Sequence, residues 1–270
     1  MFKNLFFSKV LKVMAIIALY LFSLTNAKAQ ILAWEFNGAA GNETTIASTT
    51  TDANLNGSSV SRGAGINPAP LGNAFSSNDF TVSGTFTDAV NNNEYLQFAV
   101  NAKSGYQVSL STLDVNFRRS STGPNTFQWQ YSLDGFATSG INIGTAISYT
   151  TSPTNGTAQT QIDLSAISAL QNVTNTTTIT LRLYGYGASQ LTGTFAFGRL
   201  TGNDLAIGGT VTSSGGPSLT VGTLSNQFGN VCTGTTTNYE TFTVSGSNLD
   251  GSSVDVGTLS GFAYCLTPNG

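Results

Sequence analysis

The sequence predicts an all-β protein of antiparallel β-sandwich architecture, and three observations support this prediction. Charged residues make up only 9% of the chain and hydrophobic residues 40%. The chain is therefore poor in the charged residues of amphipathic helices but has enough apolar residues for a folded core. Apolar and polar residues alternate over short runs, as they do in half-buried strands. Gly, Asn, Ser and Pro separate these runs, with no repeated helical segment between them.

Residues 1–29 have the pattern of a secretory signal peptide. Lys3, Lys9 and Lys12 precede an apolar stretch, 13–24, that is too short to span a bilayer comfortably, and a small-x-small cleavage site follows at 27–29. Cleavage there would leave a chain that begins at Gln30. We therefore expect a secreted or cell-surface protein that is not inserted in the membrane after cleavage.

The charge of the chain restricts its partners and its chemistry. After cleavage, six basic and 13 acidic residues remain, a formal charge of −7. This balance argues against nucleic acid or an anionic membrane as partner, because both are bound by clustered Lys and Arg. The chain has no histidine, which excludes Ser-His-Asp, Cys-His and His-ligated zinc mechanisms within it. We expect no catalytic residues and no enzyme activity in this chain.

Residues 30–211 are predicted to form the first module. Alternating runs place its strands at 95–100, 113–117, 127–133, 178–186, 194–200 and 205–211. One short helix is expected where Asp163, a natural N-cap, precedes apolar residues spaced by three, Leu164, Ile167 and Leu170. The tract 49–73 is rich in Asn, Gly, Ser and Pro and is expected to be loop, either a ligand loop or an irregular surface crossing.

A second module is predicted after a Gly/Ser linker at 212–217. Alternation resumes there and indicates strands around 219–221, 242–244, 254–256 and 262–264, with a tight turn at 250–251. A complete immunoglobulin-like sandwich needs roughly 100 residues and about seven strands. We therefore expect 218–270 to be an incomplete module, from an incomplete gene product or a longer protein.

The two cysteines, Cys232 and Cys265, both lie in this second module. In an exported protein such a pair more often forms a disulfide than a metal site or a reactive thiol. A disulfide closing this loop would stabilise the fold by about 3 to 4 kcal/mol. The alternative is a pair of small buried hydrophobic residues.

Two sets of aromatic residues are candidates for sugar stacking. Phe127, Trp129 and Tyr131 share one strand face, but we favour a core role for them because Leu133 and Phe136 suggest a packed strand end.

The second set is Arg182, Tyr184 and Tyr186, whose guanidinium and phenol groups could stack on and hydrogen-bond to a glycan or peptide. Asn116 and Arg118 could join this ligand-binding face from a neighbouring strand. An ordinary amphipathic outer sheet explains the same residues.

A pair of carboxylates is the candidate metal site. Glu35 lies on the first strand and Asp204 precedes the last. If these strands are neighbours, the two carboxylates with backbone carbonyls could hold a structural calcium ion, the one cofactor that the sequence suggests. The alternative is two solvated carboxylates. A glycosidase would also need paired acids, but no recognisable signature is present.

The first module resembles a jelly-roll-type module found at the front of secreted multidomain surface proteins of the Bacteroidetes. The resemblance rests on LAWEFNG (32–38), VNFRRSSTGP (115–124), YSLDGF (131–136), LRLYGY (181–186) and NDLAIGG (203–209). The remainder is similar to the immunoglobulin-like repeats of the same proteins through FTVSGSNL (242–249) and GFAY (261–264). The resemblance implies a jelly-roll-like sandwich, export by a type IX system and a non-catalytic spacer or binding role.

These inferences predict a secreted or cell-surface, non-catalytic β-sandwich module for adhesion, presentation or glycan binding, with a polysaccharide or cell-surface glycan as partner. The alternative is the accessory N-terminal part of a larger extracellular hydrolase. In that case a nuclease, peptidase or glycanase domain would lie beyond Gly270.

Overall fold

The structure is a computed structural model that describes residues 30–215, 218–224, 240–247 and 257. The chain divides into two compact units, and the division falls between Thr212 and Ser213, at the start of the predicted linker. The predicted signal peptide and both cysteines, Cys232 and Cys265, lie outside the described residues.

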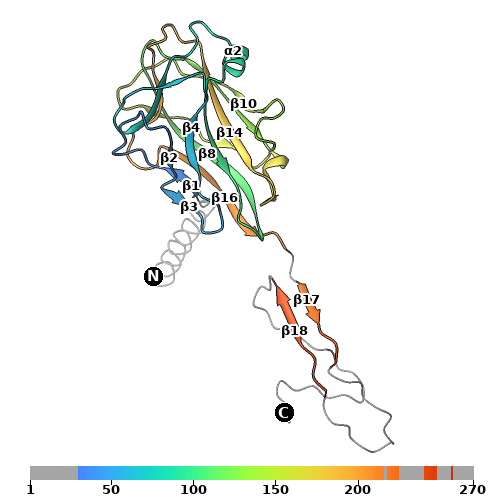
Figure 1. Cartoon of the computed structure of the whole chain (residues 1–270). Coiled ribbons are helices and arrows are strands. Elements are labelled where there is room, and N and C mark those ends of the chain that lie inside the picture. The colour runs from blue at the N-terminus through green and yellow to red at the C-terminus, as the bar shows by residue number, and fades with distance from the viewer. Residues whose placement is uncertain (1–29, 216–217, 225–239, 248–256, 258–270) are drawn as a thin grey trace, which may run out of the picture. The chain divides into compact units, whose positions relative to one another are not determined.

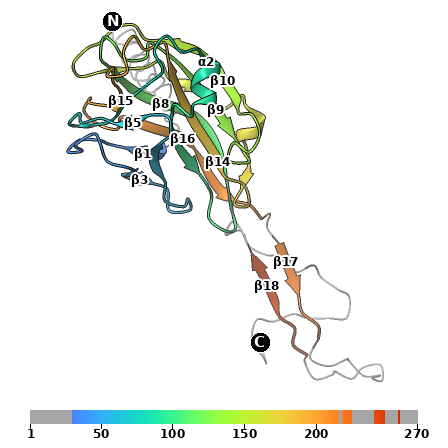
Figure 2. The same cartoon turned by 45° about the horizontal axis from the view of Figure 1, so that its top comes forward.

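The first unit contains two antiparallel sheets in a sandwich-like layout, which confirms the predicted fold class (Figures 1 and 2). The larger, ten-stranded sheet consists of β1 (Gln30–Trp34), β3 (Thr50–Thr51), β5 (Asn67–Pro68), β6 (Ala74–Asn78), β8 (Tyr106–Arg119), β11 (Thr157–Ala158), β12 (Ile162–Asp163), β13 (Val173–Thr174), β15 (Phe195–Gly198) and β16 (Leu205–Ser213). Its strand order is β3-β1-β16-β8-β15-β6-β5, and β11, β12 and β13 also pair with β8.

The smaller, six-stranded sheet has the strand order β10-β9-β14-β7-β4-β2. Its strands are β2 (Ile46–Ala47), β4 (Ser59–Arg62), β7 (Tyr95–Val100), β9 (Thr126–Ser132), β10 (Ile141–Ser148) and β14 (Ile179–Tyr186). Strands predicted from alternation coincide with β7, β8, β9, β14, β15 and β16, although β8 extends further than its predicted run.

The hydrophobic core lies between the two sheets. Aromatic rings meet across it: Phe117 of β8 and Phe127 of β9 have ring centroids 5.0 Å apart, and Trp129 of β9 stacks on Phe197 of β15 at 6.0 Å. Phe127, Trp129 and Tyr131 are at most 4% exposed, which confirms their core role. Leu133, by contrast, is 39% exposed and does not close that strand end.

The helix predicted at Asp163 is wrong. Asp163 belongs to β12, and its carboxylate accepts hydrogen bonds from the backbone N–H and the hydroxyl of Ser165, at 2.8 and 2.6 Å. Only a single 3₁₀ turn, η1 (Ser168–Leu170), follows. Leu164 and Leu170 are fully buried, so the apolar spacing marks residues that anchor an irregular segment to the core.

The α-helix that the structure does describe, α2 (Phe86–Asn91), was not predicted. A capping box begins it: the Thr85 hydroxyl accepts from the Asp88 N–H at 3.3 Å, and the Asp88 carboxylate accepts from the Thr85 N–H at 2.8 Å. Helix α2 packs against β14 (Figures 1 and 2). Among the described residues, no helix has the length and apolar character to cross a membrane.

The tract 49–73, predicted as loop, contains three short strands, β3, β4 and β5. Arg62 at the end of β4 ties this tract to the other sheet: its Nε donates to the Ser77 hydroxyl at 2.8 Å, and its guanidinium lies 3.7 Å from the Phe75 ring centroid. Burial lowers the pKa of Arg62 to about 10 despite the nearby carboxylate of Glu43. Charge-assisted hydrogen bonds and cation–π contact thus order a segment whose composition suggests a loop.

In the second unit the structure describes one antiparallel strand pair, β17 (Ser218–Val221) and β18 (Val244–Ser247). β17 lies where alternation predicted it, whereas β18 begins at Val244, where the strand predicted around 242–244 ends. The strands predicted around 254–256 and 262–264 fall outside the described residues.

Candidate functional site

Arg182 is the centre of the predicted ligand-binding face on β14. Its guanidinium lies between the rings of Tyr95 and Phe136, 3.9 Å from each ring centroid. Its Nε donates to Gln97 Oε1 at 3.0 Å, and its Nη1 donates to the Tyr184 hydroxyl at 3.3 Å. The guanidinium is therefore held by stacking and hydrogen bonds within the protein.

Tyr184 cannot serve as a stacking platform, because helix α2 covers it. The side chain is 2% exposed, and its ring meets Phe86 edge-on at a centroid distance of 5.8 Å. Burial raises the pKa of Tyr184, although its bond from Arg182 acts in the opposite direction. Tyr186 is half-buried, with its ring 6.0 Å from Phe86. The predicted platform is wrong for Tyr184, since the sequence did not reveal the covering helix.

Asn116 and Arg118 do not join this face. They lie on β8 in the ten-stranded sheet, whereas the neighbours of β14 in the six-stranded sheet are β7 and β9. The Asn116 amide donates to Asp204 Oδ1 at 3.0 Å, and Arg118 Nη1 donates to Thr194 Oγ1 at 2.9 Å. The prediction of a neighbouring strand is wrong because β8 and β14 belong to opposite layers.

The two carboxylates proposed for calcium do lie at adjacent strand ends. Strands β1 and β16 pair antiparallel with Trp34 opposite Leu205, so Glu35 and Asp204 directly follow and precede that pair. Asp204 is 1% exposed and accepts hydrogen bonds from the Asn116 amide and, at 3.2 Å, from the backbone N–H groups of Phe36 and Leu200.

These hydrogen bonds account for the burial of the Asp204 carboxylate without a metal ion. Burial, with a contribution from the nearby charge of Glu35, raises the pKa of Asp204, while the three N–H donors lower it. The Glu35 carboxylate itself accepts from the Asn37 N–H at 3.1 Å. The described part of the chain holds no group of three or more His, Cys, Asp or Glu side chains placed to bind a metal. Calcium at this pair stays a prediction.

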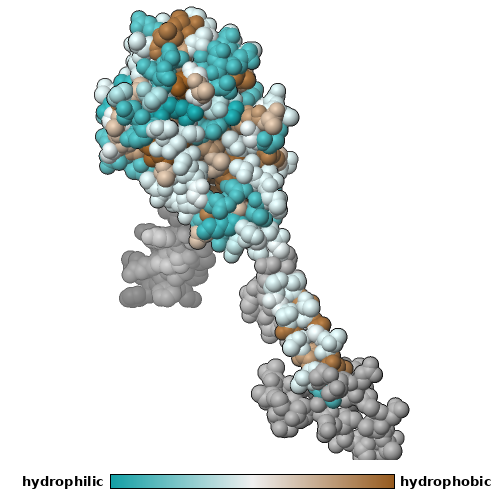
Figure 3. All heavy atoms as spheres, in the orientation of Figure 1, coloured by the Kyte–Doolittle hydropathy of each residue, from teal (hydrophilic) through white to brown (hydrophobic). Residues whose placement is uncertain are grey.

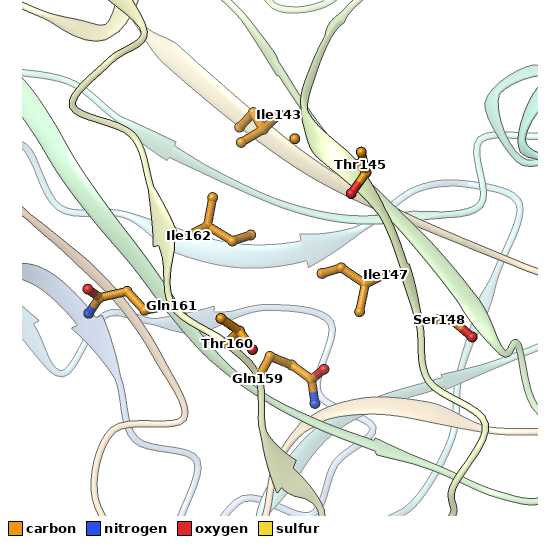
Figure 4. A pocket seen from close by; sticks show the side chains of 9 residues that line it. Ile143, Thr145, Ile147, Ser148, Gln159, Thr160, Gln161 and Ile162 are labelled. Carbon is orange, nitrogen blue, oxygen red and sulfur yellow. The ribbon is translucent and has the colours of Figure 1, made fainter.

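An open cleft of about 410 Å³ lies at one edge of the sandwich. One wall is β10, and the other is the segment 159–162, which includes the start of β12 (Figure 4). Its lining residues are Ile143, Gly144, Thr145, Ile147, Ser148, Gln159, Thr160, Gln161 and Ile162. Figure 4 shows the isoleucines pointing toward one another across the cleft. Gln161 points away and donates to the Asp114 carboxylate at 2.8 Å.

A bulge in β10 shapes this cleft. Pairing between β10 and β9 shifts register between Ile143 and Ile147, and Gly144 has a φ of 61°. A residue with a side chain is strained at such a φ, so glycine suits the position. The Gln128 amide donates to the Ile143 and Gly144 carbonyls at 3.2 and 3.4 Å, which satisfies groups that the bulge removes from the ladder.

The cleft can bind neutral polar groups. Its lining combines isoleucine side chains with hydroxyl and amide groups that both donate and accept hydrogen bonds, and none of the lining side chains titrates. It therefore offers no acid–base pair for hydrolysis. The sequence did not reveal the cleft, because its walls come from opposite sheets; Gly144 in an otherwise alternating run was the one available signal.

Most of the visible surface of the first unit is hydrophilic or intermediate in hydropathy. On the visible face of the first unit, Figure 3 shows hydrophilic and intermediate residues over most of the area and hydrophobic residues in small separate places. That face therefore presents no broad apolar patch as a candidate for recognition (Figure 3).

The chain was also compared with known proteins. A scan against protein-family models found no match, and a search of curated proteins found none.

Proposed function

We propose that this protein is a secreted or cell-surface, non-catalytic β-sandwich module that binds a polysaccharide and serves adhesion or presentation. The observation that carries the proposal is the cleft between β10 and 159–162, whose lining combines three isoleucines with neutral hydroxyl and amide groups. The volume of about 410 Å³ lies within the usual range for ligand sites.

The lining suits the chemistry of a sugar. Sugar hydroxyls need partners that donate and accept, and Thr145, Ser148, Thr160 and Gln159 supply both kinds. The C–H groups of a sugar ring can lie on the isoleucine side chains. The predicted signal peptide and the resemblance to modules of Bacteroidetes surface proteins, exported by a type IX system, support the extracellular location.

The proposal is tested by affinity electrophoresis of the purified protein in gels containing different polysaccharides. Removing two hydroxyls with the isosteric changes Thr145→Val and Thr160→Val should weaken binding about fivefold or more, since each lost hydrogen bond contributes about 0.5 to 1.5 kcal/mol. Thr220→Val is the matched control, because Thr220 is exposed on β17 of the second unit. Retention that is unchanged in the double variant, or absent for the wild type on every polysaccharide, would reject the proposal.

The role of an accessory module ahead of a hydrolase domain is compatible with the same cleft. Coding sequence beyond Gly270 separates the two: a nuclease, peptidase or glycanase motif supports the accessory role, and further repeats support adhesion.

A further inference from the structure

Two arginines, one in the ten-stranded sheet and one directly after its strand β15, lie near the turn at 153–156. Arg118 lies on β8 opposite Ala196 of β15, and Arg199 directly follows β15. Arg199 Nη1 donates to the Thr154 carbonyl at 3.1 Å. A Cβ atom placed on Gly156 would lie 3.4 Å from the Arg118 Cβ and 2.8 Å from the Gly198 carbonyl oxygen. The turn is therefore packed against both strands that carry the arginines.

Both guanidinium groups have unused donors. Within the described residues, Arg118 donates to the Thr194 hydroxyl and Arg199 to the Thr154 carbonyl, and the Nε of each is buried without a hydrogen-bond partner. A buried donor without a partner is unfavourable, so each Nε–H can still take an acceptor.

Arg119, the next residue after Arg118, uses its guanidinium donors within the protein. Its guanidinium donates to the carbonyls of Pro124, Thr150, Ser121 and Gly123 and thereby holds the loops around it. Arg119 is thus fully engaged, whereas Arg118 and Arg199 are not.

The positive charges of Arg118 and Arg199 are not neutralised by their hydrogen-bond partners. Both hydrogen bonds go to neutral oxygens. Burial lowers the pKa of Arg118, and the charge of Arg199 lowers it further. Arg199 Nη1 contacts the turn and the Arg118 Cβ packs beside it, so the two side chains start from neighbouring places. The planar N–H donors of guanidinium groups match the geometry of carboxylate and sulfate oxygens.

The arginine pair is linked to the cleft by the chain itself. The loop that contacts the arginines connects β10, one wall of the cleft, with the segment 159–162, the other wall. Tyr149 fixes this loop: its hydroxyl donates to the Phe117 carbonyl at 2.9 Å and lies 3.2 Å from Thr157 Oγ1. A ligand that leaves the cleft past Ser148 and Gln159 therefore approaches this loop.

From this geometry we infer that Arg118 and Arg199 bind a carboxylate or sulfate group of an acidic polysaccharide whose neutral part occupies the cleft. The inference rests on the proposed glycan-binding function and specifies its ligand class.

The test compares matched acidic and neutral polymers in affinity electrophoresis: polygalacturonate with its methyl ester, and dextran sulfate with dextran. The first pair reports on a carboxylate and the second on a sulfate. The wild type should bind one acidic polymer about tenfold or more tightly than its neutral counterpart, and Arg118→Gln with Arg199→Gln should remove that preference. Lys103→Gln removes one positive charge about 40 Å away, just before the start of β8, and should retain the preference.

The outcomes separate the inference from the proposed function. Equal retention of acidic and neutral polymers, or a preference that survives in the double glutamine variant, overturns the inference while leaving glycan binding intact. Failure of every polymer to be retained rejects the proposed function. The arginine site is then tested with galacturonate against methyl galacturonate by NMR: shifts of the Arg118 and Arg199 Nε–H signals with galacturonate alone support it, and their absence overturns it. Arg118→Lys with Arg199→Lys, which keeps the charges, controls for folding.

Discussion

Replacing Tyr184 with alanine should destabilise the first unit, because the side chain anchors helix α2. The Tyr184 ring is 2% exposed and meets the rings of Phe86 and Tyr95 at centroid distances of 5.8 and 5.4 Å. Its hydroxyl accepts the bond from Arg182. Truncation would leave a cavity between β14 and α2.

The expected loss of unfolding free energy follows from these contacts. Removing a buried aromatic side chain costs about 3 to 5 kcal/mol. Tyr184→Phe keeps the ring and removes only a 3.3 Å hydrogen bond from a half-buried guanidinium, so it should cost about 1 kcal/mol or less. At about 2 to 4 °C per kcal/mol, the alanine variant should melt roughly 6 to 20 °C below the wild type.

Urea unfolding followed by tryptophan fluorescence measures both variants, and hydrogen exchange of the α2 amides reports whether the helix loosens. Polysaccharide retention is then measured where the alanine variant is still folded, and it should match that of the wild type. Retention lost in a Tyr184→Ala protein with an unchanged urea midpoint would refute this reasoning, because it would show a ligand-contacting ring.

Three further predictions concern buried polar groups. Gln128→Leu should lower the unfolding free energy by about 1 to 3 kcal/mol and weaken polysaccharide binding, because it removes the amide that donates to the carbonyls of the β10 bulge. Urea titration measures the first effect, and affinity electrophoresis measures the second. Because burial raises the native pKa of Asp204, its contribution to stability is greatest at acid pH and declines as pH rises from about 4. Urea titrations should show this decline in the wild type relative to Asp204→Asn, and a pH-independent difference would contradict it. Calcium at the predicted Glu35–Asp204 site should raise the melting temperature by several degrees and a chelator should reverse the rise; an unchanged melting temperature would contradict the site and leave Asp204 with its three N–H donors alone.

Strands with strict alternation could be predicted because the sandwich buries one side of each. In β14, Leu181 and Leu183 are buried and Arg182 is half-buried, as a period of two requires. Helix α2 escaped prediction because it has only six residues, and its capping box uses Asp88 where Glu or Gln is usual. The apolar spacing at Leu164 and Leu170 resembled a helix because core anchors in an irregular segment can share that spacing.

The site could not be predicted, because alternation reports which way a side chain points and not what covers it. Gln128 and Gln130 point away from the core on β9, yet they are 5% and 7% exposed. Gln128 donates to the β10 bulge, and the Gln130 amide donates to Asn142 Oδ1 at 2.9 Å. The outer face of the six-stranded sheet is thus closed by polar contacts beside β10 and by α2 over β14. The cleft proposed for recognition lies instead at the sandwich edge, where the pairing of β10 with β9 shifts register between Ile143 and Ile147 and the segment 159–162 faces β10 from the other sheet.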